Sequence, residues 1–144
     1  MSQVLRITSE REISIRHLAY ADKVPLQWNL GSLADGLRCY RNAEFFEAHE
    51  HWELVWLGLD EPEKSFLQAV IQVTAAFHHL QTGNTVGAAS LLRRALHRLE
   101  GCPAHFGGIA AASLCHEVRQ ALQNIEGMPA QTNPITAPHI LTVD

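Results

Sequence analysis

Apolar residues recur every three to four positions from Leu33 to Ile125, and this helical period constrains the fold more than any other feature of the sequence. The pattern predicts helices with short connections, at about residues 32–42, 43–57, 63–81, 84–99 and 109–125. The third has the longest apolar stripe, formed by Phe66, Leu67, Val70, Ile71, Thr74 and Phe77. Because helices joined by short turns pack side by side, we predict an all-α fold, a compact array of about five helices.

Capping and helix-breaking residues indicate where these helices begin and end. The side chains of Ser32 and Asn84 can accept a hydrogen bond from a first helical turn, so they are the expected N-caps of the first and fourth helices. Gly58 and Gly83 are the expected ends of the second and third. Pro62 suits the first turn of the third helix, where its missing N–H costs nothing.

The segment before the first helix has no such period, and we expect residues 1–30 to form an extended N-terminal arm. Ile13 and Ile15 alternate with polar residues, which is typical of a short strand or an extended chain. Trp28 and Leu30 are the expected anchors of this arm. The 144 residues, 47% of them hydrophobic, suffice for one core, so residues 31–144 are predicted to form a single helical domain.

Composition excludes several classes of protein. The net charge of −4 disfavours general disorder and makes a nucleic-acid partner unlikely, since no excess of Lys and Arg is present to neutralise phosphates. No stretch approaches the length of a membrane span, so no membrane partner is expected. Charges near the N-terminus do not suit a signal peptide, and three cysteines without CxxC spacing favour a reducing compartment. We therefore expect a soluble, cytoplasmic protein.

The segment from Asn42 to Glu53 carries the chemistry of greatest interest. On a helix, Phe46, Glu50, Glu53 and Leu57 share one face, and His49 flanks this face four residues before Glu53. Carboxylates and an imidazole among large apolar side chains do not resemble an ordinary solvated surface. Burying them costs several kcal/mol unless each is hydrogen-bonded, paired or bound to a metal. The pattern predicts a buried polar cluster or a metal site.

The metal hypothesis rests on the spacing of His49 and Glu53. His49 and Glu50 open the zinc-protease pattern HExxH, but Glu53 occupies the position of the second histidine. A His/Glu pair one turn apart can still ligate a divalent metal, with Glu50 as the general base toward a bound water. Bundles that hold two metals need a second ExxH segment, which this chain lacks.

The expected pairing of the second and third helices favours a hydrogen-bonded cluster over a metal site. If the helices at 43–57 and 63–81 form an antiparallel hairpin, residues whose numbers add to about 122 lie at the same height. His49 is then level with Gln72, and Glu53 with Gln68, and glutamine is a better hydrogen-bond partner than metal ligand. His79 lies about 9 Å along the helix from this level, which is too far to share a metal with His49. We expect His79 to cap carbonyls or pack near its helix end.

Several of these motifs together resemble the family known as domain of unknown function 309. The resemblance lies in residues 42–56, in 68–72, in His79, in Gly83–Asn84 with Gly87–Ala88, and in the closing segment 138–141. It covers about residues 33–141 and leaves the N-terminal arm outside. It implies a compact all-helical fold. Members of the family are labelled predicted metal-dependent hydrolases, and at matching positions that label implicates His49, Glu50, Glu53, Gln72 and His79.

Two classes of function remain open. The first hypothesis is a non-catalytic binding or structural module, whose polar cluster specifies the fold and whose outer face binds a partner or a second copy. Trp52 and Trp56 are candidates for that face, and the second copy would make the protein a homo-oligomer. The second is a metal-dependent hydrolase with a substrate that the sequence does not identify. A basic strip is interpreted mainly as a solvated helix face, with an anionic partner as the lesser alternative; it consists of Arg93, Arg94, His97 and Arg98.

Overall fold

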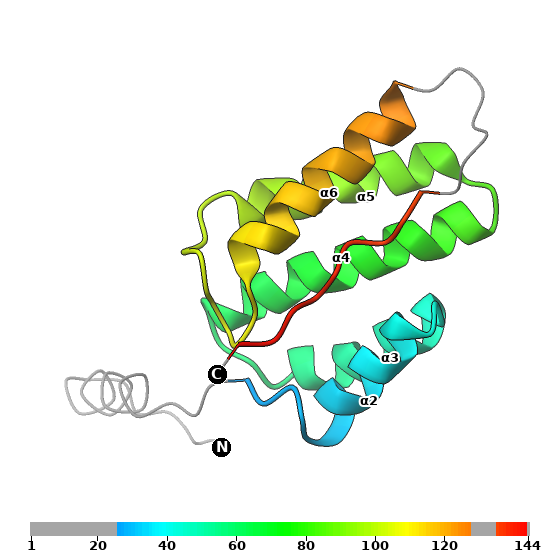
Figure 1. Ribbon diagram of the computed structural model, residues 1–144. Coiled ribbons are helices and arrows are strands. Elements are labelled where there is room, and N and C mark those ends of the chain that lie inside the picture. The colour runs from blue at the N-terminus through cyan, green and yellow to red at the C-terminus, as the bar shows by residue number, and fades with distance from the viewer. Residues whose placement is uncertain (1–25, 128–134, 144) are drawn as a thin grey trace, which may run out of the picture.

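Helices account for most of the chain in the computed structural model, which describes residues 26–127 and 135–143 (Figure 1). They follow one another as α2 (Gly31–Arg41), α3 (Phe45–Trp56), α4 (Glu63–Gln81), α5 (Thr85–Leu99) and α6 (Ala111–Glu126). Within these ranges the only β-type pairings are isolated bridges. The predicted all-α array of five helices is therefore confirmed.

The ends of the helices agree with the sequence where a cap was recognised. Asn84 caps α5 as predicted, because its side-chain oxygen accepts a hydrogen bond of 2.8 Å from the backbone N–H of Gly87. The prediction for Ser32 is wrong, since the N-cap of α2 is Leu30 and makes no side-chain capping bond. Gly31 begins this helix with φ of 59°, a left-handed conformation that glycine adopts readily. The turn therefore closes two residues earlier than a Ser32 cap would place it.

Helix α4 lies at the centre of the array. It contacts α3 on one side and α5 on the other, α2 packs on α3, and α6 packs on α5 (Figure 1). Its predicted apolar stripe is buried in full. The largest fully buried side chains of the core include Trp52, Phe66, Leu67, Leu92, Leu99, Ile109 and Leu114.

The predicted antiparallel register of α3 and α4 is confirmed by contacts along both helices. The rings of Phe45 and Phe77 lie 5.8 Å apart, and those of Phe46 and His78 lie 5.5 Å apart. At the other end of the hairpin, Trp56 Nε1 donates a hydrogen bond of 3.1 Å to the carbonyl of Lys64. Each of these pairs has residue numbers that add to within about two of 122, as the hairpin requires.

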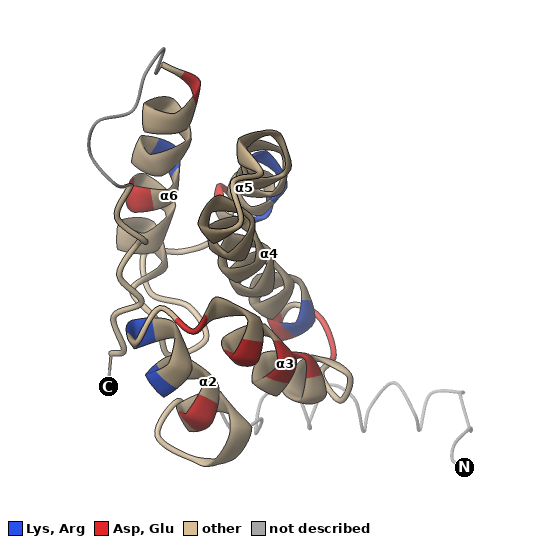
Figure 2. Cartoon of the chain, turned by 90° about the vertical axis from the view of Figure 1, so that its right-hand side faces the viewer, with Lys and Arg blue, Asp and Glu red and all other residues tan. Residues whose placement is uncertain are grey.

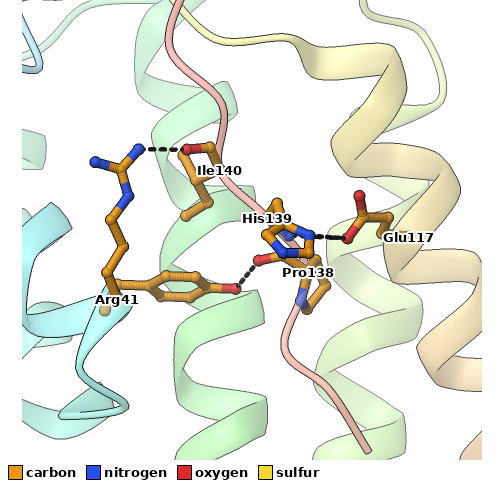
Figure 3. A network of polar contacts seen from close by, with 6 residues as sticks. Arg41, Glu117, Pro138, His139 and Ile140 are labelled. Carbon is orange, nitrogen blue, oxygen red and sulfur yellow. Dashed lines mark hydrogen bonds and ion pairs between the residues drawn. The ribbon is translucent and has the colours of Figure 1, made fainter.

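Residues 135–143, here called the C-terminal strap, run between α2 and α6 and connect these two helices (Figure 1). Tyr40 donates a buried hydrogen bond of 2.7 Å to the carbonyl of Pro138, and Arg41 donates one of 3.0 Å to the carbonyl of Ile140. On the α6 side, Glu117 Oε1 lies 2.9 Å from the backbone N of His139 and 3.0 Å from its Nδ1 (Figure 3). The strap therefore closes the face of the core that α2 and α6 leave between them.

The N-terminal arm is described only from Leu26 onward, so the predictions for Ile13 and Ile15 lie outside the described residues. Trp28 is an anchor, as predicted: its ring packs edge-on against Trp52, and its Nε1 donates a hydrogen bond of 2.7 Å to the carbonyl of Gly107. Leu30, the second expected anchor, is exposed instead. In the described ranges no helix is both long and apolar enough to cross a bilayer.

Candidate functional site on α3 and α4

The residues singled out on α3 share a face, but that face points to solvent. The buried side of the helix is formed by Phe45, Ala48 and Trp52 instead. Glu50 and Glu53 are exposed, so the prediction that their face is buried is wrong. The reason lies in two adjacent phenylalanines: the period allows either Phe45 or Phe46 to face the core, and Phe45 does so together with Trp52.

His49 sits at the border between the buried and exposed sides of α3. Its Nε2 lies 3.4 Å from Glu53 Oε2, and its ring stacks on that of Phe46 with centroids 6.3 Å apart. Its Nδ1 is shielded from solvent and has no hydrogen-bond partner in the structure as described. Since more than half of the Glu53 side chain is exposed, the pair contributes little to stability.

The two glutamines and His79 of α4 do not complete a cluster with His49 and Glu53. Gln72 is 8% exposed, and its Oε1 has no hydrogen-bond partner among the described residues. Gln68 is partly exposed one turn earlier. His79 Nδ1 lies 3.2 Å from Asn84 Nδ2 in the turn to α5, as expected of a residue near a helix end. The described residues therefore do not show the predicted buried hydrogen-bonded network, although its members lie on facing helices.

A catalytic zinc centre has three protein ligands around one point. His49 and Glu53 supply two, and the described residues contain no group of three or more His, Cys, Asp or Glu that could hold a metal ion. Glu50 is exposed one residue along the same helix from His49 and adds no third ligand to this pair. The donor set does not fit such a centre, so we derive no reaction step through a metal; ligation by His49 and Glu53 stays a prediction.

The His49→Ala variant measures what this pair contributes. We expect the free energy of unfolding to fall by about 1 kcal/mol or less, because a partly exposed ion pair is worth little. Urea denaturation gives this value, and metal analysis of untagged protein should show the same content before and after the change. His51→Ala on the same helix is the matched control. Loss of a stoichiometric metal in His49→Ala alone would restore the hydrolase hypothesis.

Charge is distributed unevenly over the three central helices. The stretch from residue 42 to residue 63 contains no Lys or Arg and seven carboxylates, which belong to Glu44, Glu47, Glu50, Glu53, Asp60, Glu61 and Glu63. Figure 2 shows acidic positions on α3 and basic positions on α5, with α4 between them. The sequence already shows that this stretch has no lysine or arginine. That absence predicts an acidic surface, which the search for motifs does not detect.

The position of the tryptophans also differs from expectation. Trp52 is fully buried in the core, so the prediction that it lies on a contact face is wrong. Trp56 is only partly exposed, and Lys64 Nζ lies 4.4 Å from the centroid of its ring. The large apolar side chains that are exposed here are Phe46 and Leu54 of α3 and its C-cap residue, Leu57. Leu54 is the one that sequence analysis did not identify.

Comparison with known proteins shows a similarity that includes part of this site. The family model "Domain of unknown function (DUF309)" matches residues 33–91, which include α3, α4 and the first half of α5. An uncharacterised protein of Aquifex aeolicus is 29% identical over 110 residues, which is 76% of this chain and 27% of that protein. The chain thus spans about a quarter of the relative it matches. The closing segment 138–141 lies beyond the family match. The resemblance to the DUF309 family is therefore confirmed over residues 33–91.

Proposed function

We propose that this chain is a non-catalytic binding module that contacts a basic, amphipathic segment of a partner protein through the outward side of α3. This α3 outer face consists of Phe46, Glu47, Glu50, Glu53, Leu54 and Leu57. The observation that carries the proposal is the exposure of three large apolar side chains among carboxylates, on a helix that has no lysine or arginine.

The apolar part of this face is larger than scattered surface residues would produce. Phe46, Leu54 and Leu57 are 48%, 66% and 67% exposed. Leu54 and Leu57 are one turn apart, and Phe46 lies about two turns earlier on the same side of the helix. Single exposed apolar residues are normal, but a group on one helix face is typical of a contact surface. The Phe46 ring already rests on those of His49 and His78, so binding orders little of it.

The charged part of the face restricts the partner. Glu47, Glu50 and Glu53 alternate with the apolar side chains, and their charge attracts lysines and arginines and repels anionic surfaces. An amphipathic helix that carries leucines and lysines matches both properties, since such helices dock with apolar anchors at a spacing of three and four residues. Anionic lipid and nucleic acid are poor candidates for the same reason.

Two further observations support a module over an enzyme. The donor atoms near His49 do not fit a catalytic metal centre, as shown above. The matching segment of the Aquifex aeolicus protein is about a quarter of that chain, so the relative combines it with other sequence.

The test is titration of the full chain with a synthetic amphipathic helix made of leucine and lysine, followed by calorimetry. We expect saturable binding that the double variant Leu54→Gln with Leu57→Gln weakens by about tenfold or more, because each buried leucine contributes more than 1 kcal/mol. The matched control is Val86→Gln on α5, an apolar side chain that is 81% exposed and lies outside the α3 outer face. This variant should bind like the wild type.

Two results would overturn the proposal. Equal affinity of the wild type and the double variant would mean that the peptide is held only by unspecific charge attraction. Concentration-dependent self-association in sedimentation velocity, if abolished by the double variant, would assign the α3 outer face to a second copy of the chain instead.

A further inference from the structure

A shallow groove of about 640 Å³ lies between α4 and α5. Ser65 and Gln72 line it from α4, and the α5 side consists of Arg93, Arg94, His97 and Arg98. None of these lining residues carries a carboxylate. The sequence predicts that the basic strip of α5 is a solvated helix face. This strip borders a concave surface without carboxylates, and the positive charge of such a surface concentrates anions.

Two of the four basic side chains are held in place by neighbours. Arg98 Nη1 donates a hydrogen bond of 2.8 Å to Ser65 Oγ, and Arg93 Nε donates one of 3.1 Å to Glu126 Oε2. Arg94 and His97 have no ion pair or hydrogen bond with any residue in 26–127 or 135–143. The groove thus combines the positioned guanidinium of Arg98 with the side chains of Arg94 and His97, which form no hydrogen bond to a described residue.

Gln72 adds an independent observation. Gln72 is more than nine-tenths buried and lines the groove, yet its Oε1 is shielded from solvent and accepts no hydrogen bond from another described residue. A buried polar group without a partner costs about 1–3 kcal/mol and is rare in folded proteins. That oxygen is an acceptor, so it needs a donor group such as a hydroxyl, whereas the arginines beside it need acceptor oxygens. A phosphorylated molecule that also carries hydroxyl groups offers both.

We infer that this groove binds a small phosphorylated molecule, with its phosphate oxygens accepting hydrogen bonds from Arg94 and Arg98. A phosphate group suits this set because it presents several strong acceptors to forked guanidinium donors. The basic residues span about 8 Å along α5, which provides for one or two phosphate groups and not for a nucleic-acid backbone. The site lies across α4 from the acidic α3, and it does not depend on the proposed partner of that helix (Figure 2).

The experiment is calorimetric titration of the full chain with pyrophosphate at low salt. We expect saturable binding with one molecule per chain, weakened by about tenfold in Arg94→Gln, since a charge-assisted bond to phosphate is lost. Arg94 is exposed, so its replacement leaves the fold intact. The control is Arg38→Gln, an exposed arginine of α2 outside the groove, which should bind as the wild type does.

Three results would overturn the inference. The first is the absence of saturable pyrophosphate binding. The second is an equal loss of affinity in Arg38→Gln and Arg94→Gln, which would indicate unspecific attraction to surface charge. The third is tighter binding of a single-stranded RNA that Arg94→Gln also weakens, because the ligand would then be a polyanion that extends beyond the groove.

Discussion

Replacing Trp52 by alanine is expected to lower the free energy of unfolding by about 3–5 kcal/mol. The side chain is fully buried between α2, α3 and the described end of the N-terminal arm. Its ring lies 5.6 Å from that of Trp28 and 5.9 Å from that of Tyr40, and its Nε1 donates a hydrogen bond of 3.2 Å to the carbonyl of Leu33. Alanine would leave a cavity and would remove the added hydrogen bond that the carbonyl of Leu33 accepts. Urea denaturation followed by circular dichroism measures the loss.

Trp56→Ala is the matched control, because it removes the same side chain from a partly exposed position on the same helix. Its cost should be clearly smaller. Gly36 supplies a second check from the opposite side, since a Cβ there would lie 2.3 Å from Trp52 Nε1 and Gly36→Ala would displace the ring. Equal effects of the two tryptophan variants would show that Trp52 is not the centre of this contact.

Replacing Tyr40 by phenylalanine is expected to destabilise the protein by about 1–2 kcal/mol near neutral pH. The phenol is buried, and the variant leaves the carbonyl of Pro138 without its hydrogen-bond donor. Burial, with a smaller contribution from the charge of Glu117, raises the pKa of Tyr40 far above its ordinary value of 10.0. The folded chain therefore keeps the phenolic proton at a pH where the unfolded chain has released it.

The sign of the pH dependence follows from this difference. The contribution of Tyr40 is complete below the ordinary tyrosine pKa of about 10, and it decreases by about 1.4 kcal/mol for each pH unit above that value. Tyr40→Phe lacks this term, so the gap in stability between wild type and variant should shrink as the pH rises beyond 10 and then reverse. Urea titrations of both proteins at neutral and alkaline pH measure it. Parallel pH profiles would contradict the assignment.

The sequence predicts the helices well because their signals are local. The bounds of α4 agree with the apolar period, and the start of α5 agrees with Asn84, whose cap depends on residues three positions away. The C-terminal strap could not be predicted in this way. Its hydrogen bonds to Tyr40 and Arg41 join backbone carbonyls to residues almost a hundred positions earlier, and no periodicity marks such a partner.

The candidate site shows a different limit. Helical spacing correctly places Phe46, Glu50, Glu53 and Leu57 on one face, and it correctly pairs His49 with Glu53. It does not tell which way that face points, because both sides of α3 carry aromatic residues. The choice depends on tertiary contacts, above all the packing of Trp52 against Trp28 and Tyr40. Because Glu50 and Glu53 face solvent, the cost of burying a carboxylate does not apply to them.

The C-terminal strap has a consequence for the order of events in folding. The hydrogen bonds from Tyr40 to Pro138 and from Arg41 to Ile140 close loops of 98 and 99 residues. Closing such long loops is slow compared with forming neighbouring helices. On the ribosome, α2 emerges long before residues 138–140 are synthesised, so during that interval the hydroxyl of Tyr40 bonds to water instead of the strap. A chain interrupted before residue 135 would keep this part of its core open to the chaperones and proteases that bind nascent proteins.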